Sequence, residues 1–259
     1  MSLHKKSVQF GLLLFVSLFS ISSQAQESYD AVSPYRPSVS SPALLPLKGQ
    51  VEFELGLLRM KQDDVRRDSL PYLFKLAFSK EWGVLLGGEV QVVNRADHAA
   101  TQRGFGDLNL ILKRAFLNEN GSAFGVEFGS KFATAIANIG SGKNDFVLNG
   151  IYSRDLGAVH MDLNLNLTHL GAVDTGSASL QKAWSSSFSM PINDKWGVTG
   201  EVSGTVRKGA ASAAQTLLAL TYSPHNRLTI DFGVVKGLSK GAPDYSLFSG
   251  FVLPVAKLF

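Results

Sequence analysis

The chain has 259 residues, with 25 Lys and Arg against 21 Asp and Glu, no cysteine, 25 glycines and 17 phenylalanines. Its length suits one large all-β domain or two small ones, and its glycine and phenylalanine content favours strands and tight turns over helices. The lack of cysteine excludes disulfides, a lipoprotein anchor and a thiolate metal site. Without Lys5 and Lys6 of a signal peptide, 23 basic residues stand against 21 acidic ones, a balance that does not indicate a nucleic-acid binder.

Residues 1–25 have the organisation of a secretory signal peptide. A basic start precedes an apolar run over residues 10–21, and Ser23 and Ala25 supply the small residues of a cleavage site. We predict cleavage after Ala25. The alternative is an uncleaved anchor, but the apolar run is shorter than the roughly 20 residues of a spanning helix. No apolar stretch of about 18 residues follows, so we expect no helical membrane span.

Residues 26–48 form a Pro/Ser-rich segment ahead of the first predicted strand. It contains Pro34, Pro37, Pro42 and Pro46 among serines. Because proline cannot donate a backbone hydrogen bond, we expect the segment to be extended and irregular. The sequence leaves two placements open: the segment hangs in the periplasm, or it enters the lumen of a barrel as a partial plug.

From residue 49 onward, apolar and polar residues alternate in about twelve segments. The alternation has no error in Val159–Thr168, where one face carries Val, Met and three Leu and the other carries His, Asp, two Asn and Thr. Successive side chains of a strand point to opposite faces, so each segment predicts a two-faced strand. The predicted strands are Gly49–Met60, Leu70–Ser79, Val84–Asn94, Gly106–Phe116, Ala123–Thr134, Asp145–Asp155, Val159–His169, Leu180–Met190, Trp196–Arg207, Gln215–Ser223, Leu228–Gly237 and Asp244–Val252 or beyond.

The connections between these strands alternate in length. Every second one is a short turn, at residues 80–83, 118–122, 155–158, 191–195 and 224–227. The others are longer, at residues 61–69, 95–105, 135–144, 171–179 and 208–214, with a shorter last one at 236–243. Short periplasmic turns that alternate with longer external loops are typical of an up-and-down barrel in the outer membrane.

The positions of aromatic residues also favour an outer-membrane barrel. Lys80–Val84 and Asp194–Val198 repeat one motif, which places Trp82 and Trp196 at short turns, where barrels carry an aromatic girdle. Two similar hairpins in a soluble protein are the alternative reading of this repeat. The chain finishes on Phe259, and outer-membrane barrels commonly end on an aromatic residue read by the insertion machinery. That machinery is therefore a predicted partner of the last strand.

A soluble β-sandwich also alternates, so the choice depends on how far the pattern persists. Every lipid-facing strand of a membrane barrel must be apolar on its outside, whereas the edge strands of a sandwich usually carry charges on both faces. Almost every predicted strand here has one apolar face. We therefore predict an all-β fold: one closed antiparallel up-and-down transmembrane β-barrel of about twelve strands, residues 49–259, in the outer membrane of a Gram-negative cell.

The polar faces of the predicted strands then line the lumen. Such a lining mixes acids and bases, which brace the barrel and set preferences among solutes and ions. The predicted lumen residues are Glu52, Glu54, Lys75, Glu89, Gln91, Asp107, Asn109, Lys113, Glu127, Lys131, Asn149, His160, Asp162, Asn164, Asn166, Glu201 and Asp231.

Enzymatic and metal chemistry have little support. His160 and Asp162 share a face, but a hydrolase also needs a nucleophile beside an oriented base. No serine or acid can be assigned beside His169, which would face lipid. The five histidines show no ligand spacing, and Gly104–Gly106 lacks the following helix of a nucleotide loop. We expect no cofactor and no catalytic residue.

Two stretches carry a family resemblance. One is Tyr35–Pro42 with Lys48–Gly56, an Arg-Pro element followed by a first strand with an acid ahead of a glycine; the other is Gly104–Leu110 followed by Lys113. They resemble a family of Gram-negative outer-membrane transporters named for the meta-pathway of phenol degradation. The resemblance implies an outer-membrane channel or transporter, and it implies no residue-level mechanism.

These observations predict a passive outer-membrane channel for uptake or efflux of small molecules, aromatic or hydrophobic compounds among them. The expected partners are outer-membrane lipid and a small solute, with no nucleic acid. Two alternatives remain: a structural or adhesive barrel with a blocked lumen and, third, an outer-membrane enzyme that modifies lipids.

Overall fold

The computed structural model describes residues 30–97, 99–136 and 139–259, which contain thirteen strands and no helix. No helix in this described part of the chain is long and apolar enough to cross a membrane. The strands are β1 (Gln50–Gln62), β2 (Val65–Ala77), β3 (Trp82–Ala96), β4 (Gln102–Gly104), β5 (Leu108–Leu117), β6 (Ala123–Phe132), β7 (Asp145–Leu156), β8 (Val159–His169), β9 (Leu180–Pro191), β10 (Trp196–Arg207), β11 (Ala213–His225), β12 (Leu228–Gly237) and β13 (Tyr245–Lys257).

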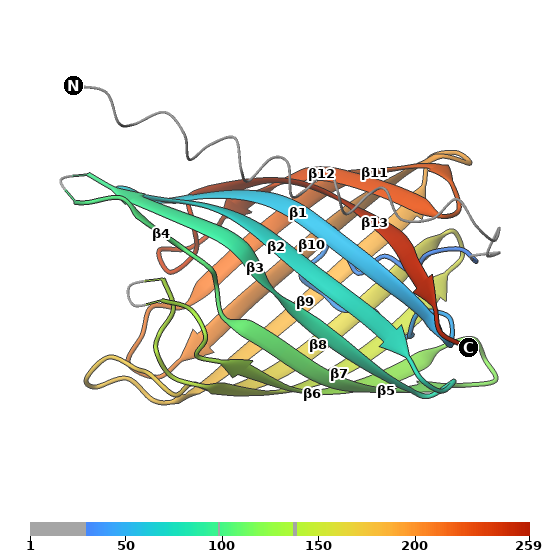
Figure 1. Cartoon of the computed structure of the whole chain (residues 1–259), viewed down its shortest axis with the longest axis horizontal. Helices are drawn as coiled ribbons and strands as arrows, with labels where there is room; N and C mark the ends of the chain where they lie inside the picture. The colour runs from blue at the N-terminus through green and yellow to red at the C-terminus, as the bar shows by residue number, and fades with distance from the viewer. Residues whose placement is uncertain (1–29, 98, 137–138) are drawn as a thin grey trace, which may run out of the picture.

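Twelve of these strands close into one antiparallel barrel whose strands are tilted to its long axis (Figure 1). Each strand pairs with its neighbours in sequence, and β1 closes the ring by pairing with β13. The short β4 pairs only with β3, on which it lies as a thirteenth strand. The predicted fold class, a closed barrel of about twelve strands, is confirmed.

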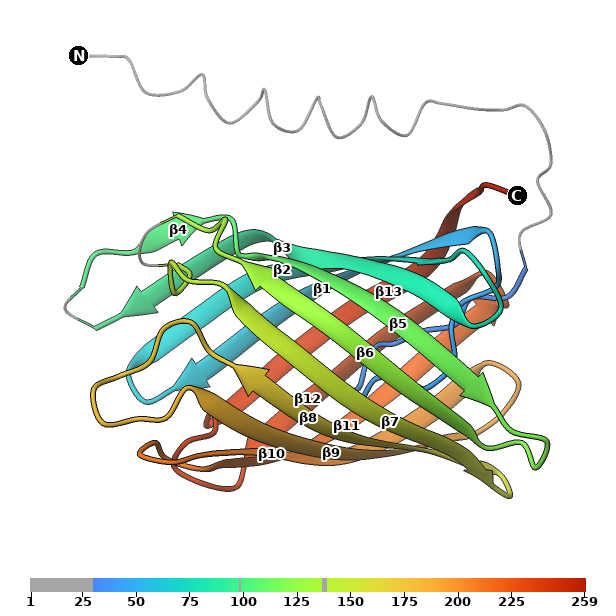
Figure 2. The same cartoon turned by 90° about the horizontal axis from the view of Figure 1, so that it is seen from below.

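The two ends of the barrel differ in their connections (Figure 2). We call the end with the C-terminus the turn end, because its connections are short, such as Asn226–Arg227 between β11 and β12. We call the opposite end the loop end; its longer connections include residues 133–144 and 170–179. Aromatic rings gather on the outside near the turn end, where the Trp196 and Tyr222 ring centroids lie 4.7 Å apart.

One predicted loop is wrong. Residues 61–69 are not a loop: β1 and β2 continue to a two-residue turn at Asp63 and Asp64. The prediction failed because residues near the tip are polar on both faces, so the period-two pattern disappears although the pairing continues. Arg59 and Asp68 are direct partners in this extension, with Nε and Oδ1 2.7 Å apart.

The barrel is apolar outside and polar inside. Leu165, Phe128 and Leu247 are 72%, 58% and 51% exposed on the outward face. Among the described residues, 21 polar or charged residues are buried, against 13 hydrophobic ones. Water-soluble domains have the reverse arrangement, because apolar surface leaves water. The sequence of these strands therefore suits a barrel whose outside is covered by hydrocarbon.

Candidate functional site

Most of the described residues 30–48 lie inside the barrel, in blue behind the front strands of Figure 1, and both ends of this stretch lie at the turn end. We call residues 30–48 the luminal segment. Their hydrogen bonds and ion pairs reach nine strands, on opposite sides of the lumen: β1, β2, β5, β7, β8, β9, β10, β12 and β13. Of the two placements that the sequence left open, the structure shows the luminal one.

Two buried lysines near the turn end, each paired with acids of the wall, hold one aromatic ring of the luminal segment. Glu52 and Lys75 are direct partners on β1 and β2, and the Lys75 Nζ lies 2.9 Å from Glu52 and 2.6 Å from Glu54. Lys113 on β5 pairs with Glu127 on β6 at 2.9 Å. A buried charge is costly unless it is paired, so these cross-strand partners depend on one another.

The ring belongs to Tyr35. The ammonium groups of Lys75 on β2 and Lys113 on β5 each lie 4.4 Å from its centroid. This is the distance of a cation–π contact. The Tyr35 hydroxyl donates to the Leu44 carbonyl at 2.7 Å, which folds the luminal segment back on itself.

Carboxylates of the wall accept the backbone N–H groups of the luminal segment. Glu54 accepts from Tyr35 at 2.8 Å, and one oxygen of Glu201 accepts from both Val39 and Ser40 at 2.9 Å. A proline-rich chain away from the sheet has no strand to satisfy these donors, and an unpaired buried N–H is costly. The carboxylates of the wall thus accept the backbone N–H groups that a neighbouring strand would otherwise pair.

Arg36 fits a niche made by a pair of glycines. Its guanidinium makes a two-point contact with Asp231, with Nε to Oδ2 at 2.9 Å and Nη2 to Oδ1 at 3.0 Å. Gly56 and Gly250 are direct partners on β1 and β13, and a Cβ on either would lie 2.5 Å from a guanidinium nitrogen of Arg36. The wall must therefore lack side chains here for the arginine to reach Asp231.

Serine and asparagine side chains hold the second half of the luminal segment. Ser40 and Ser185 have their Oγ atoms 2.8 Å apart. Asn164 accepts from the Ser41 N–H at 3.0 Å and donates to the Ser41 carbonyl at 2.9 Å, and the Ser153 hydroxyl accepts from the Ala43 N–H at 2.7 Å. These neutral contacts depend on geometry more than on charge.

Two cavities lie against the luminal segment. One, of about 260 Å³, is lined by Val39 together with wall residues that include Asn149, Asn166 and Gln215. The other, of about 240 Å³, lies beside Tyr35 and Arg36. Both are bounded by the luminal segment, so a continuous wide passage would require that segment to move.

The predicted lumen residues fall into four groups. Ten are buried in the wall around the luminal segment: Glu52, Glu54, Lys75, Lys113, Glu127, Asn149, Asp162, Asn164, Glu201 and Asp231. Toward the loop end, Lys131 lies 3.1 Å from both Asp107 and Asp145, and Glu89 pairs with Arg67. Asn109 is the ladder partner of Lys131, and Asn166 lines the larger cavity. His160 lies at the turn end between Asp155 and Asp162, at 2.6 and 3.2 Å.

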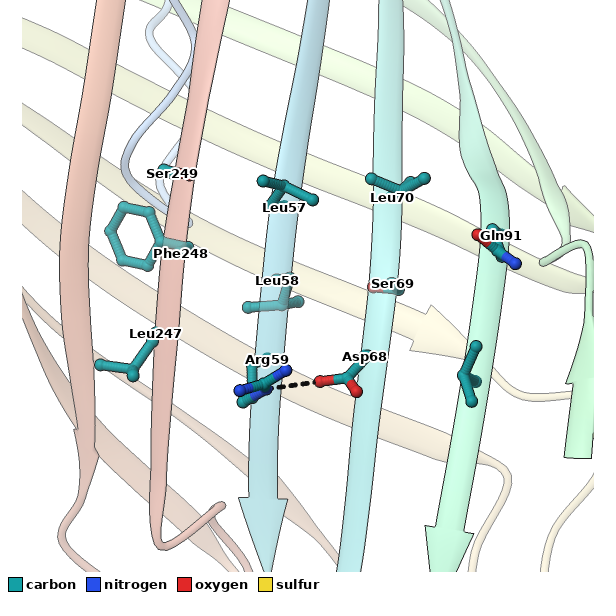
Figure 3. Close-up of a pocket in the computed structure, with 11 residues that line it drawn as sticks. Leu57, Leu58, Arg59, Asp68, Ser69, Leu70, Gln91, Leu247, Phe248 and Ser249 are labelled. Carbon is teal, nitrogen blue, oxygen red and sulfur yellow. Dashed lines mark hydrogen bonds and ion pairs between the residues drawn. The ribbon is translucent and has the colours of Figure 1, made fainter. Parts of the chain in front are cut away.

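Gln91 does not line the lumen, so its predicted place among the lumen residues is wrong. It is exposed and lies on the outside with Leu57 and Leu70 (Figure 3). The pairing of β2 with β3 shifts between Ser69 and Pro71, so two residues of β3 stand opposite Leu70. A β-bulge of this kind changes which face the following residues occupy, and strict alternation in the sequence could not reveal it.

His160 is not part of a nucleophile–base arrangement. Asp162 stands between Ser153 and His160 and accepts from the Ser153 hydroxyl. A catalytic serine needs the histidine next to its hydroxyl. His169 has Phe146 and Leu180 as its ladder partners.

Sequence reasoning missed Tyr35, Arg36 and the two wall serines Ser153 and Ser185 as members of this site. The Tyr-Arg-Pro triplet of residues 35–37 was a usable signal, since an aromatic and a charged side chain stand out in a segment of small residues. The wall serines carry no such signal, because serine is equally common in turns.

The sequence matches no protein-family model and no curated protein. The fold is similar to solved outer-membrane channels. The COG4313 outer membrane channel from Pseudomonas putida F1 has a TM-score of 0.65 at 13% identity, covering 90% of this chain and 100% of that one. The NanC porin has 0.56 at 8%, covering 79% and 100%. The CymD monoaromatic hydrocarbon channel has 0.52 at 7%, covering 82% and 90%. Together with the inside-out barrel, these likenesses define the fold class: that of outer-membrane channel and porin barrels.

Proposed function

We propose that the protein is an outer-membrane channel for small molecules, and that the luminal segment is its gate. The observation that carries the proposal is the way this segment is held. It crosses a closed barrel without adding a strand to it, through side-chain hydrogen bonds and ion pairs. It can therefore leave the lumen without breaking the barrel.

The chemistry of the lumen suggests the solute class. Asn149, Asn166 and Gln215 around the larger cavity offer both donors and acceptors, and the Asn149 Oδ1 has no partner in the structure. Small molecules that combine hydroxyl groups with a compact ring suit such a cavity, and the phenol-related family resemblance agrees with this. CymD is described as a channel for monoaromatic hydrocarbons.

A disulfide lock tests the gate. The chain has no cysteine, and the Ser40 and Ser185 Oγ atoms are 2.8 Å apart, so the double variant Ser40→Cys/Ser185→Cys places two thiols within reach of a sulfur–sulfur bond of about 2.05 Å. In a planar bilayer we expect oxidation to abolish most of its conductance and a reductant to restore it. Deletion of residues 26–48 should raise conductance several-fold over wild type.

The single variant Ser185→Cys is the matched control and should not respond to oxidant. If wild type, the reduced double variant and the deletion variant all lack conductance and solute flux, the channel proposal is wrong.

A structural or adhesive barrel is the second candidate, because the luminal segment fills the lumen across nine strands. It predicts no conductance in wild type or in the reduced double variant. The two functions are thus separated by the conductance of wild type and of the reduced double variant, since removal of a blocking segment could open a structural barrel as well.

A further inference from the structure

Toward the loop end, the outward-facing residues change from apolar to charged on five neighbouring strands, β12, β13, β1, β2 and β3. Phe251, Leu55 and Tyr72 form one apolar row across β13, β1 and β2. The next outward row contains Leu57, and beyond it lies Arg59 with Asp68 as its partner. Arg59 and Asp68 are therefore the first charged outward pair on β1 and β2, in a row where Leu247 of β13 is still apolar.

The row beyond Arg59 is basic. Ladder partners follow one another from Lys236 through Tyr245, Lys61 and Arg66 to Arg95. Direct partners in a ladder project from the same face of the sheet. We call Arg59, Lys61, Arg66, Arg95 and Lys236 the basic patch.

One carboxylate organises three arginines of the basic patch. Asp68 lies 2.7 Å from Arg59, 3.1 Å from Arg66 and 2.5 Å from Arg95, and the three arginines come from three strands. Figure 3 shows the Arg59–Asp68 pair on the outside of the wall. Three guanidinium groups share a single negative charge, so a net charge of about +2 remains on them before the two lysines are counted.

Other acids lie near the tip, but among the described residues none of them forms an ion pair with the basic patch. Asp63 and Asp64 occupy the turn beyond it, and Asp97 follows the end of β3. Asp244 already accepts the N–H of Asp63 at 3.0 Å. On the wall formed by β7 to β9, the corresponding outward row at the ends of the strands is Phe146, His169 and Leu180, which has no lysine or arginine. On that wall Lys182 is a single outward lysine one row closer to the apolar band, whereas the basic patch gathers five basic residues on four of the five neighbouring strands.

A hollow of about 460 Å³ lies where the apolar band meets the basic patch. Its lining includes Leu57, Leu70 and Leu247 together with Arg59 and Asp68. Apolar side chains next to guanidinium groups match a molecule with a hydrocarbon part and an anionic head. A lipid of the surrounding membrane has both, at the same depth.

We propose that the basic patch binds the phosphate groups of an anionic lipid in the leaflet at the loop end. The guanidinium group of arginine can donate two parallel hydrogen bonds to the oxygens of one phosphate. Basic residues at a membrane surface also attract anionic head groups. Asp68 holds the three guanidinium groups in place for this contact. The inference rests on the proposed placement of the barrel in the outer membrane.

Native mass spectrometry of the full chain in a neutral detergent tests the proposal. The probes are a diphosphorylated lipid A and the same lipid without phosphates. We expect wild type to retain the phosphorylated lipid. The variant Arg59→Gln/Arg66→Gln/Arg95→Gln should bind it on the order of 100-fold more weakly, because each basic residue near a membrane surface contributes about one factor of five.

The control Arg114→Gln/Arg154→Gln/Lys195→Gln removes three charges at the turn end and should bind like wild type. Equal weakening in both triple variants, or no preference of wild type for the phosphorylated lipid, would overturn the proposal. The lipid preference of wild type stays decisive even if a triple variant fails to fold.

Conductance separates this site from the channel. Loss of lipid binding with unchanged conductance supports the basic patch as a lipid site. Absence of conductance in wild type refutes the channel without affecting the binding result.

Discussion

Glycine determines where the luminal segment can be anchored. Gly56 and Gly250 leave room for one guanidinium, and the two-point contact of Arg36 with Asp231 needs that room. The pair neutralises a buried carboxylate, which would be costly alone. The two-point hold on the luminal segment is therefore set at single positions by the absence of a side chain as much as by charge.

Gly56→Ala should loosen the gate. The three heavy atoms nearest to the new Cβ all belong to Arg36, the nearest at 2.5 Å, so the arginine must withdraw from Asp231. We expect a loss of about 1–3 kcal/mol from the luminal contact, the cost of leaving a buried group poorly paired, and a conductance closer to that of the deletion variant. Gly200→Ala is the control, since its Cβ would meet nothing within 4 Å. Equal conductance of the two variants would show that the glycine niche does not hold the gate.

At the scale of elements, pairing continues beyond the point where alternation ends. The β1–β2 hairpin extends to the turn at Asp63 and Asp64, although its outer part is polar on both faces. Pro71 of β2 stands next to the register shift that turns Gln91 outward. A proline cannot donate to the ladder, which fits its place beside a bulge.

The hairpin turn should respond to substitution at Asp63, which adopts a φ of 48°. A β-branched residue is strained in this left-handed region by about 1–2 kcal/mol, whereas glycine adopts it freely. We expect Asp63→Val to lower the urea midpoint of the refolded barrel and Asp63→Gly to keep or raise it. Asp64→Val, one position along the same turn, is the comparison. If Asp63→Val and Asp63→Gly unfold at the same urea concentration, the turn does not limit the stability of the hairpin.

For the whole molecule, the closure of the strand ring does not depend on the segment that fills the lumen. Every barrel strand has two strand neighbours without help from residues 30–48. The luminal segment adds side-chain contacts inside an already complete wall. The charged lining can be wetted when the segment leaves, so charges such as Lys75 need not remain desolvated.

Deletion of residues 26–48 should therefore leave the barrel folded. We expect the truncated protein to keep its β-sheet circular dichroism and the faster gel migration of an unheated barrel, with a lower thermal midpoint because the luminal contacts are lost. Wild type refolded in parallel is the reference. A truncated chain that stays unfolded would show that the barrel requires its luminal segment.

The sequence by itself determined the two-faced barrel strands, about twelve of them, and their order, because a closed barrel in hydrocarbon imposes one apolar face on every strand. It also indicated most of the inward side chains, since Glu52, Asn164 and Asp231 follow from simple alternation. Only the tertiary structure decided that residues 30–48 enter the lumen, because that placement depends on partners far apart in the chain, such as Arg36 and Asp231. It also decided that Gln91 turns outward and that Arg59, Arg66 and Arg95 meet at Asp68, since register and bulges are set by the pairing of strands and not by the pattern within one strand.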